Sequence, residues 1–286
     1  MYRQVLEDLT FENGFLLKHT DGLVTRGNVR EFTLCNTAKS PARWHLAQWC
    51  CNFNLAQGSE FVNYDNSVTI SDPTKTVRTF RNGRIYLELR ASMEYQHLRR
   101  DGEGWPHILI EQEFTSPAYL HKAKKLLLGL DFTVSNLRNG MRPDEQQHIH
   151  CAQFQYIFAV ADVNPASEGF GDYYWFNFSL LDTRYEFPPA FMQQDGGKEE
   201  NTGKFIYVPE MSEILKTPVV PCRRRSIEFD VKPEMEKAFK IAKQRGFLPK
   251  SRYEDIAVKN TNIGWEVTGT FDVGVDIEKI SFVCDE

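Results

Sequence analysis

The stretch AQFQYIFAV, residues 152–160, contains the pattern that decides the fold of this chain. Its even positions are all apolar or aromatic, while Gln153 and Gln155 occupy the first two odd positions. Alternation with period two is typical of a β-strand that buries one face, because successive side chains of a strand point to opposite sides of the sheet. The stretch therefore predicts a strand in an antiparallel sheet with one apolar face and one polar face.

The same alternation recurs along the chain, in residues 44–55, 84–95, 126–134, 174–180 and 271–284, with shorter candidates at 29–34, 107–114, 205–208 and 226–231. Its phase changes near Glu278 and Lys279, which indicates a β-bulge. Residues 232–246 differ, because Pro233 suits the first turn of a helix and apolar residues recur there at helical spacing. We expect an all-β fold, a single antiparallel β-sandwich of jelly-roll or concanavalin A-like type, with one short helix near residues 232–246. Residues 1–286 should form one domain, because no linker or repeat divides them.

The composition excludes several classes of protein. The chain has 286 residues, of which 41% are hydrophobic and 26% charged, so it can form a core without disulfides. Its formal charge is −5 and its basic residues are scattered, which argues against nucleic acid and membrane surfaces as partners. The first thirty residues show no signal peptide. We expect a cytoplasmic protein, or a secreted one if a leader has been removed.

Cysteine and histidine supply few candidate metal ligands. The six cysteines have no repeated spacing and are expected to be buried free thiols: Cys35, Cys50, Cys51, Cys151, Cys222 and Cys284. His148 and His150 would share one face if their strand begins early, and could start a metal site or abstract a proton. The further ligands of such a site are missing, since glutamines occupy positions 153 and 155. We expect no metal and no cofactor.

The polar faces of the predicted strands carry amides, guanidinium groups and flat aromatic rings rather than the usual Thr, Lys and Ser. Sugars need this mixture, because amides and charged groups bond vicinal hydroxyls while rings pack on the apolar faces of a pyranose. If these strands are neighbours, they form one groove for an oligosaccharide or a polysaccharide fragment. The alternative is a face that the chain's own loops cover. The candidate contact residues are Trp44, Gln48, Tyr86, Arg90, His107, Gln153, Gln155, Trp175 and Arg184.

Two glutamates are candidates for acid and base chemistry. Glu88 and Glu111 could divide the roles of a glycoside hydrolase, one protonated and one ionised. The alternative is two glutamates that are exposed or paired with arginine. Residues 187–203 are rich in Pro, Gly and polar side chains, and long loops of this kind often act as lids.

In these features the chain resembles carbohydrate-active β-sandwich proteins, both jelly-roll sugar-binding modules and concanavalin A-like lyases and hydrolases. Leu87-Glu88-Leu89-Arg90 is similar to the arginine-containing strand of alginate-lyase-like sandwiches, and Gln147-His148-Ile149-His150 to their Gln-x-His strand. The resemblance implies that Arg90 would neutralise a uronate while His148 or His150 removes the neighbouring proton. The later strand with Tyr and Lys has no clear counterpart, so no catalytic tyrosine is carried over.

The sequence thus predicts a carbohydrate-binding protein that is a glycoside hydrolase or polysaccharide lyase if catalytic. A non-catalytic sugar-binding module is one alternative. A structural or assembly protein whose polar face docks another subunit is the other. The sugar and the oligomeric state are left open.

Overall fold

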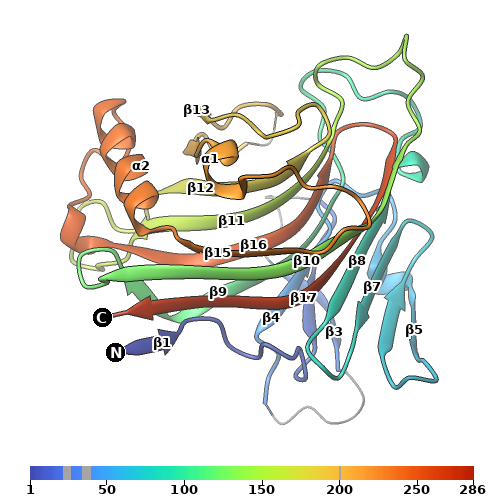
Figure 1. The fold of residues 1–286 in the computed structure, drawn as a ribbon, viewed down its shortest axis with the longest axis horizontal. Helices are drawn as coiled ribbons and strands as arrows, with labels where there is room; N and C mark the ends of the chain where they lie inside the picture. The colour runs from blue at the N-terminus through green and yellow to red at the C-terminus, as the bar shows by residue number, and fades with distance from the viewer. Residues whose placement is uncertain (22–26, 34–39, 200) are drawn as a thin grey trace.

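The computed structural model describes residues 1–21, 27–33, 40–199 and 201–286, and within them two β-sheets pack face to face (Figure 1). Sheet A has eight strands. Their order is β15 (Arg225–Asp230), β10 (Lys125–Asn139), β17 (Phe271–Asp285), β8 (Ile85–Arg90), β7 (Lys75–Thr79), β6 (Val68–Ser71) and β5 (Ser59–Val62), with β1 (Tyr2–Gln4) also paired to β17.

Sheet B has nine strands. Their order is β13 (Phe191–Gln194), β14 (Phe205–Val208), β12 (Tyr173–Asp182), β11 (Ala152–Asp162), β16 (Ile256–Val267), β9 (His107–Tyr119), β4 (Trp44–Ala47), β2 (Phe15–Lys18) and β3 (Asn28–Phe32). Most neighbouring strands are antiparallel, but β2 with β4 and β12 with β14 are parallel pairs.

The apolar faces of the two sheets meet in a core rich in phenylalanine. Phe154 and Phe158 of β11 contact Phe132 of β10 and Phe282 of β17, with ring centroids 5.2 and 4.9 Å apart. Removing such rings from water is the main favourable contribution to packing two sheets. The predicted β-sandwich is confirmed, and the even positions of residues 152–160 are its core face.

The predicted bulge is also confirmed. Asp131 of β10 pairs with Lys279, but the next residue, Phe132, pairs with Ile277. No residue of β10 therefore stands opposite Glu278 in the strand register. The extra residue lets both halves of β17 keep their apolar side chains in the core.

The predicted helix is α2 (Lys232–Gln244), which lies at one end of the sandwich in Figure 1. Its buried stripe includes Met235 and Phe239. The hydroxyl of Tyr174 in β12 donates to the Met235 carbonyl at 2.7 Å, which ties the helix to sheet B. A second helix, α1 (Met211–Leu215), is shorter, and three 3-10 turns complete the helical structure of the described residues (Leu55–Gln57, Ala91–Met93 and Tyr253–Asp255).

The expected strand at residues 44–55 is wrong beyond Ala47, where β4 ends and the chain turns. Trp44 is fully buried and its indole N–H donates to the Asp8 carbonyl. Gln48 is also fully buried, and its side chain bonds Lys18, Asn54 and Leu55. Neither residue can contact a ligand, because Trp44 lies on the core face of β4 with Leu46, and Gln48 is enclosed by the turn that its own side chain bonds.

The histidine pair and two of the cysteines differ from expectation. Strand β11 begins only at Ala152, so His148 and His150 lie in the preceding turn, His148 exposed and His150 buried. His150 Nε2 lies 2.9 Å from the Arg99 carbonyl. Cys222 is exposed and Cys50 half-buried, whereas Cys51, Cys151 and Cys284 are buried free thiols as expected. Cys35 lies outside the described residues.

The region expected to be a long loop, residues 187–203, contains strand β13 at the edge of sheet B. In the described part of the chain, no helix is long and apolar enough to cross a bilayer.

Candidate functional site

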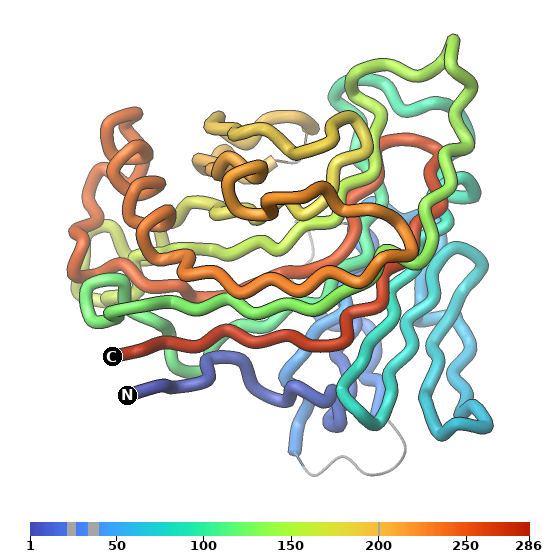
Figure 2. The backbone as a smooth tube through the Cα atoms, viewed as in Figure 1, coloured from blue at the N-terminus to red at the C-terminus, as the bar shows by residue number. Residues whose placement is uncertain are grey.

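A groove of about 790 Å³ lies on the outer face of sheet B. Strands β9, β16, β11 and β12 form its floor, since the outward side chains of all four line it. The chain that follows β12, including β13 and β14, lies above β11 and β12 in Figure 2. Phe191 and Gln193 of β13 and Ile206 of β14 also line the groove, so this edge of the sheet forms one of its walls.

Strand pairing arranges the floor residues in rows across the four strands, because residues that pair directly point to the same face. The first row is His107, Glu266, Gln153 and Asp182. The second row contains Gly264, Gln155 and Ser179, and the third Glu111, Asn262, Ile157 and Asn177. Trp175 and Asn260 lie in the fourth row, in register with Ala159.

Gly264 keeps the middle of this floor low. Its φ of +150° lies in a region that favours glycine, and an added Cβ would lie 2.2 Å from the Ile108 carbonyl oxygen. No other residue fits there without moving β9. The glycine thus lets β16 and β9 approach closely in the middle of the floor, and it adds no side chain there.

Amides connect the carboxylates of the first row. The Gln153 amide donates to Asp182 at 2.7 Å, and the Gln155 amide lies 3.3 Å from Gln153 Oε1 and 3.4 Å from Glu266 Oε2. Arg184 donates to both carboxylate oxygens of Asp182, at 2.9 and 2.5 Å. Two-point contact of this kind fixes the orientation of a carboxylate.

The pKa values of the two glutamates of the floor, Glu266 and Glu111, are shifted in opposite directions. Burial would raise the pKa of Glu266, but its contact with His107, the charge of Lys198 and the Trp105 indole together hold that pKa below its ordinary value. Burial raises the pKa of Glu111, and the attraction of Lys18, 3.5 Å away, offsets this only in part. Environments that separate two carboxyl pKa values in this way are frequent at functional sites.

Two tryptophans hold His107 in place. Its ring stacks on Trp105 with centroids 5.8 Å apart and meets the edge of Trp49 at 5.7 Å. Its Nδ1 lies 3.2 Å from the Trp49 carbonyl and its Nε2 lies 3.6 Å from Glu266. The histidine thus links the Trp49 main chain to Glu266.

The floor still has a hydrogen-bond acceptor that is not in use. Asn177 Oδ1 is buried and accepts no hydrogen bond from any described residue, although Asn177 donates to Gln155 at 3.3 Å. A buried oxygen without a donor costs free energy that a bound hydroxyl would recover. Above the floor, Tyr185 and Phe191 are 49% and 42% exposed, so aromatic faces remain free for a ligand.

The structure brings together six of the residues expected from sequence. His107, Glu111, Gln153, Gln155, Trp175 and Arg184 all line the groove. Their roles stay predictions.

Sequence reasoning did not single out Glu266 or Asn262 as site residues. The signal for Glu266 was its place between buried Trp265 and Val267, the same alternation that was used elsewhere.

The remaining candidates lie on the other side of the molecule. Tyr86, Glu88 and Arg90 alternate with the core residues of β8 and so face outward from sheet A. Glu88 forms an ion pair with Arg90. The expected pair of Glu88 with Glu111 is therefore not formed, because the sandwich separates them.

The lyase arrangement of Arg90 with His148 or His150 is not formed either. Arg90 is on the outer face of sheet A, while both histidines belong to the turn before β11 in sheet B.

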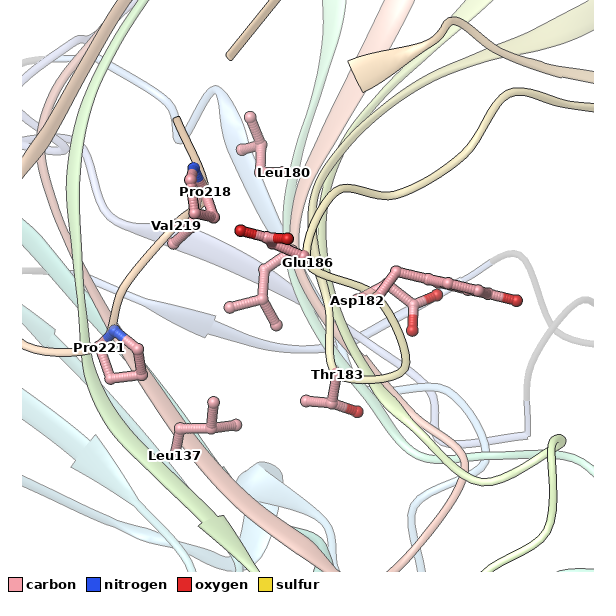
Figure 3. Close-up of a pocket in the computed structure, with 10 residues that line it drawn as sticks. Leu137, Leu180, Asp182, Thr183, Glu186, Pro218, Val219 and Pro221 are labelled. Carbon is pink, nitrogen blue, oxygen red and sulfur yellow. The ribbon is translucent and has the colours of Figure 1, made fainter. Parts of the chain in front are cut away.

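A smaller hollow of about 270 Å³ adjoins the groove at Asp182 and Tyr185. Figure 3 shows Pro218, Val219 and Pro221 on one side of it and Asp182 with Thr183 on the other. Leucine, proline and valine supply six of its ten lining residues, and it lacks the amide rows of the groove.

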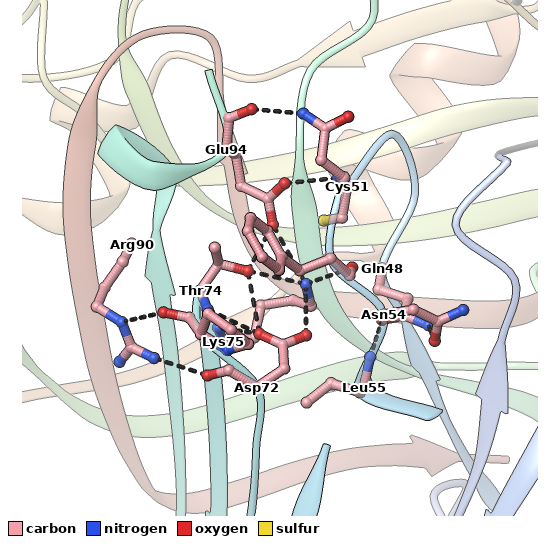
Figure 4. A network of polar contacts seen from close by, with 12 residues as sticks. Gln48, Cys51, Asn54, Leu55, Asp72, Thr74, Lys75, Arg90 and Glu94 are labelled. Atoms are coloured by element: carbon pink, nitrogen blue, oxygen red, sulfur yellow. Dashed lines mark hydrogen bonds and ion pairs between the residues drawn. The ribbon is translucent and has the colours of Figure 1, made fainter. Parts of the chain in front are cut away.

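A second polar cluster lies in the interior (Figure 4). Lys75 at the start of β7 is fully buried, with Nζ 2.9 Å from Asp72 and 3.3 Å from Glu94. It also donates to the Phe53 carbonyl at 2.8 Å. This interior cluster joins the turn after β4 to sheet A. Within the described residues, no group of three or more His, Cys, Asp or Glu side chains is placed to hold a metal ion.

No protein-family model matches the sequence, and no curated protein matches it. Among solved structures, a family 12 xyloglucanase from Bacillus licheniformis is similar, with 9% identity over 79% of this chain and 97% of that one, at a TM-score of 0.45. Endoglucanase Cel12A from Rhodothermus marinus has 10% identity over 80% and 96%, at 0.42. Endoglucanase 3 of family GH12 from Trichoderma harzianum has 10% over 86% and 99%, at 0.39. Values this low assign no function to the chain.

Proposed function

We propose that the chain is a carbohydrate-acting protein that binds an oligosaccharide in the groove of sheet B. The observation that carries the proposal is the floor itself, three rows of amides and carboxylates beneath exposed aromatic rings. Amide and carboxylate groups bond the vicinal hydroxyls of a sugar, and the rings cover its apolar faces. The unpartnered Asn177 Oδ1 supplies an acceptor for one such hydroxyl.

A neutral sugar fits the charges better than a uronate. Two cations beside the first row are engaged, since Arg184 holds Asp182 and Lys198 lies 4.5 Å from the centre of the Trp105 ring. The pKa of Glu266 is lowered, so this carboxylate is ionised at neutral pH and repels a second anion. This favours hydroxyl recognition over uronate recognition.

Hydrolysis is the second candidate, because Glu266 and Asp182 are two carboxylates in the same row of the floor. They are two strands apart in one row, so their main chains are separated by about 10 Å. Inverting glycosidases hold their two carboxyl groups about 6.5–9.5 Å apart, with a water molecule between one of them and the sugar.

In that reaction Glu266 would take a proton from water, whose oxygen bonds to the anomeric carbon as the bond to the leaving oxygen breaks. Asp182 would donate the proton to the leaving oxygen. Arg184 and the Gln153 amide already bond the carboxylate oxygens of Asp182, which opposes this role. Binding is for this reason the first candidate.

A panel of neutral and uronate-containing oligosaccharides separates the candidates. New reducing ends would indicate hydrolysis, whereas thermal stabilisation without them would indicate binding alone. Glu266→Gln should abolish cleavage or weaken binding about tenfold, and Glu88→Gln on sheet A is the matched control that should do neither. A panel that neither stabilises the protein nor is cleaved would reject the proposal.

A further inference from the structure

The segment of residues 195–199, here called the strap, crosses the groove. It leaves sheet B after β13 and returns to β14 at the edge of the sheet. Its root is fixed, because Asp195 accepts hydrogen bonds from the Thr202 N–H at 2.8 Å and the Thr202 hydroxyl at 2.6 Å. The Trp175 indole in turn donates to that hydroxyl at 3.1 Å.

The far end of the strap contacts the segment that precedes β9, on the opposite side of the groove. Lys198 pairs with Gly102 in a parallel β-bridge, and the Glu199 N–H donates to the Gly102 carbonyl at 3.1 Å. Arg99 donates to the Gly197 carbonyl at 3.2 Å. Lys198 Nζ also lies 4.5 Å from the centre of the Trp105 ring, a cation–π contact.

These contacts join two edges of the floor. The strap follows β13 at one edge of sheet B, whereas its contacts are with the segment that leads into β9, and β12, β11 and β16 lie between β14 and β9 in the sheet. Lys198 also acts on Glu266. Burial raises the pKa of Glu266, but contact with His107 and the positive charge of Lys198 are among the causes that hold it below its ordinary value. The strap therefore runs from a root beside Trp175 of the fourth row to Trp105, which stacks on His107 of the first row. Its residues Asp195 and Lys198 line the groove.

We propose that the strap closes the groove from above, so that a sugar chain enters by one end and a chain without a free end is excluded. An open groove would bind internal segments of a polymer at any point along the polymer's length. A covered groove admits only what can be threaded beneath the strap. This sets a preference for short oligosaccharides and chain ends, and it rests on the binding function proposed above.

The closure itself can be tested without a sugar. Gln155→Cys places a thiol on β11, in the middle of the floor. A polyethylene-glycol maleimide should modify it slowly and iodoacetamide readily, with exposed Cys222 as the internal reference in peptide mapping. Adding Lys198→Ala and Glu199→Pro removes the cation–π contact and the hydrogen bond to Gly102. This should speed the bulky reagent about tenfold and leave the small one nearly unchanged.

The matched control is Lys250→Ala, which removes an exposed lysine that pairs with Glu168. It should leave both rates unchanged. Equal rates for the bulky reagent with and without the strap contacts would overturn the closure.

The threading is tested with linear and cyclic β-glucan oligosaccharides of equal length, by calorimetry. The wild type should bind the linear form only, and the variant with Lys198→Ala and Glu199→Pro should bind both. Binding of the cyclic form by the wild type would overturn the proposal. If no sugar of the panel binds either protein while the thiol rates differ as expected, the binding function fails and the closure stands.

Discussion

The interior cluster and the first row of the groove are built from the same kinds of side chain. In the interior cluster Lys75, Asp72 and Glu94 have side chains that are 0%, 2% and 1% exposed. In the groove, Glu266 is 16% and Arg184 28% exposed, beneath a hollow of about 790 Å³. Burial of charge is thus common to both places. What distinguishes the groove is free space beside groups that still have bonding capacity.

Replacing Lys75 should break the interior cluster and produce the largest change in stability. Lys75→Met leaves the Asp72 and Glu94 carboxylates buried without their cation, which should lower the free energy of unfolding by about 3–5 kcal/mol. Urea unfolding measures this, with Lys250→Met as the control at an exposed ion pair. Sugar binding by the folded fraction should stay at the wild-type level. A loss of affinity without a loss of stability would contradict the division between the two clusters.

Removing an aromatic ring from the groove should weaken sugar binding and leave stability nearly unchanged, the reverse of the effect at Lys75. Trp175→Ala deletes a ring above the fourth row and should weaken oligosaccharide binding about tenfold. Trp44→Phe is the matched control, since Trp44 is fully buried and its change should lower stability instead. Calorimetry and urea unfolding of both variants separate the two effects. Equal affinities for wild type and Trp175→Ala would remove this ring from the site.

The two floor glutamates should differ in the sign of their pH dependence. The pKa of Glu111 is raised in the folded state, so its contribution to stability is full below the unfolded pKa of about 4.3 and is lost as pH rises through the folded value. The pKa of Glu266 is lowered, so its contribution is present above the unfolded pKa and is lost as pH falls through the folded value.

At neutral pH, Glu111→Gln should therefore raise the free energy of unfolding and Glu266→Gln should lower it. The wild type should lose stability relative to Glu111→Gln as pH rises from acid to neutral, and gain it relative to Glu266→Gln. Urea unfolding over this pH range gives, for each variant, the slope with pH of the difference in free energy of unfolding between wild type and variant. Slopes of the same sign would contradict the assigned environments.

The fold was predictable from sequence because alternation is a local property. Residues 152–160 and the phase change at Glu278 each specify which side of a strand is buried, and the structure confirms both. The helix was predictable for the same reason, since Pro233 and the apolar stripe are local signals.

The site was predictable only in part, because it depends on which strands are neighbours. Glu88 and Glu266 have the same local pattern, a glutamate between two buried apolar residues, yet one faces outward from sheet A and the other lines the groove. The contact of Gln155 with Glu266 joins residues 111 positions apart, and no local pattern encodes it. The error at Trp44 had a different cause, since Trp44 and Leu46 form the core face of β4 rather than its outward face.

The smallest effect on stability and on binding is expected at Glu88. This residue lies on the outer face of sheet A, which serves as a reference surface for the groove. Its side chain is 17% exposed and pairs with Arg90, which also donates to the carbonyls of Pro73 and Asp72, at 3.0 Å each. Those bonds keep Arg90 in place without the carboxylate. Glu88→Gln should therefore cost at most about 1 kcal/mol of stability, and its affinity for an oligosaccharide should equal that of the wild type. A loss of affinity as large as that of Trp175→Ala would mean that the outer face of sheet A, not only the groove of sheet B, contacts the sugar.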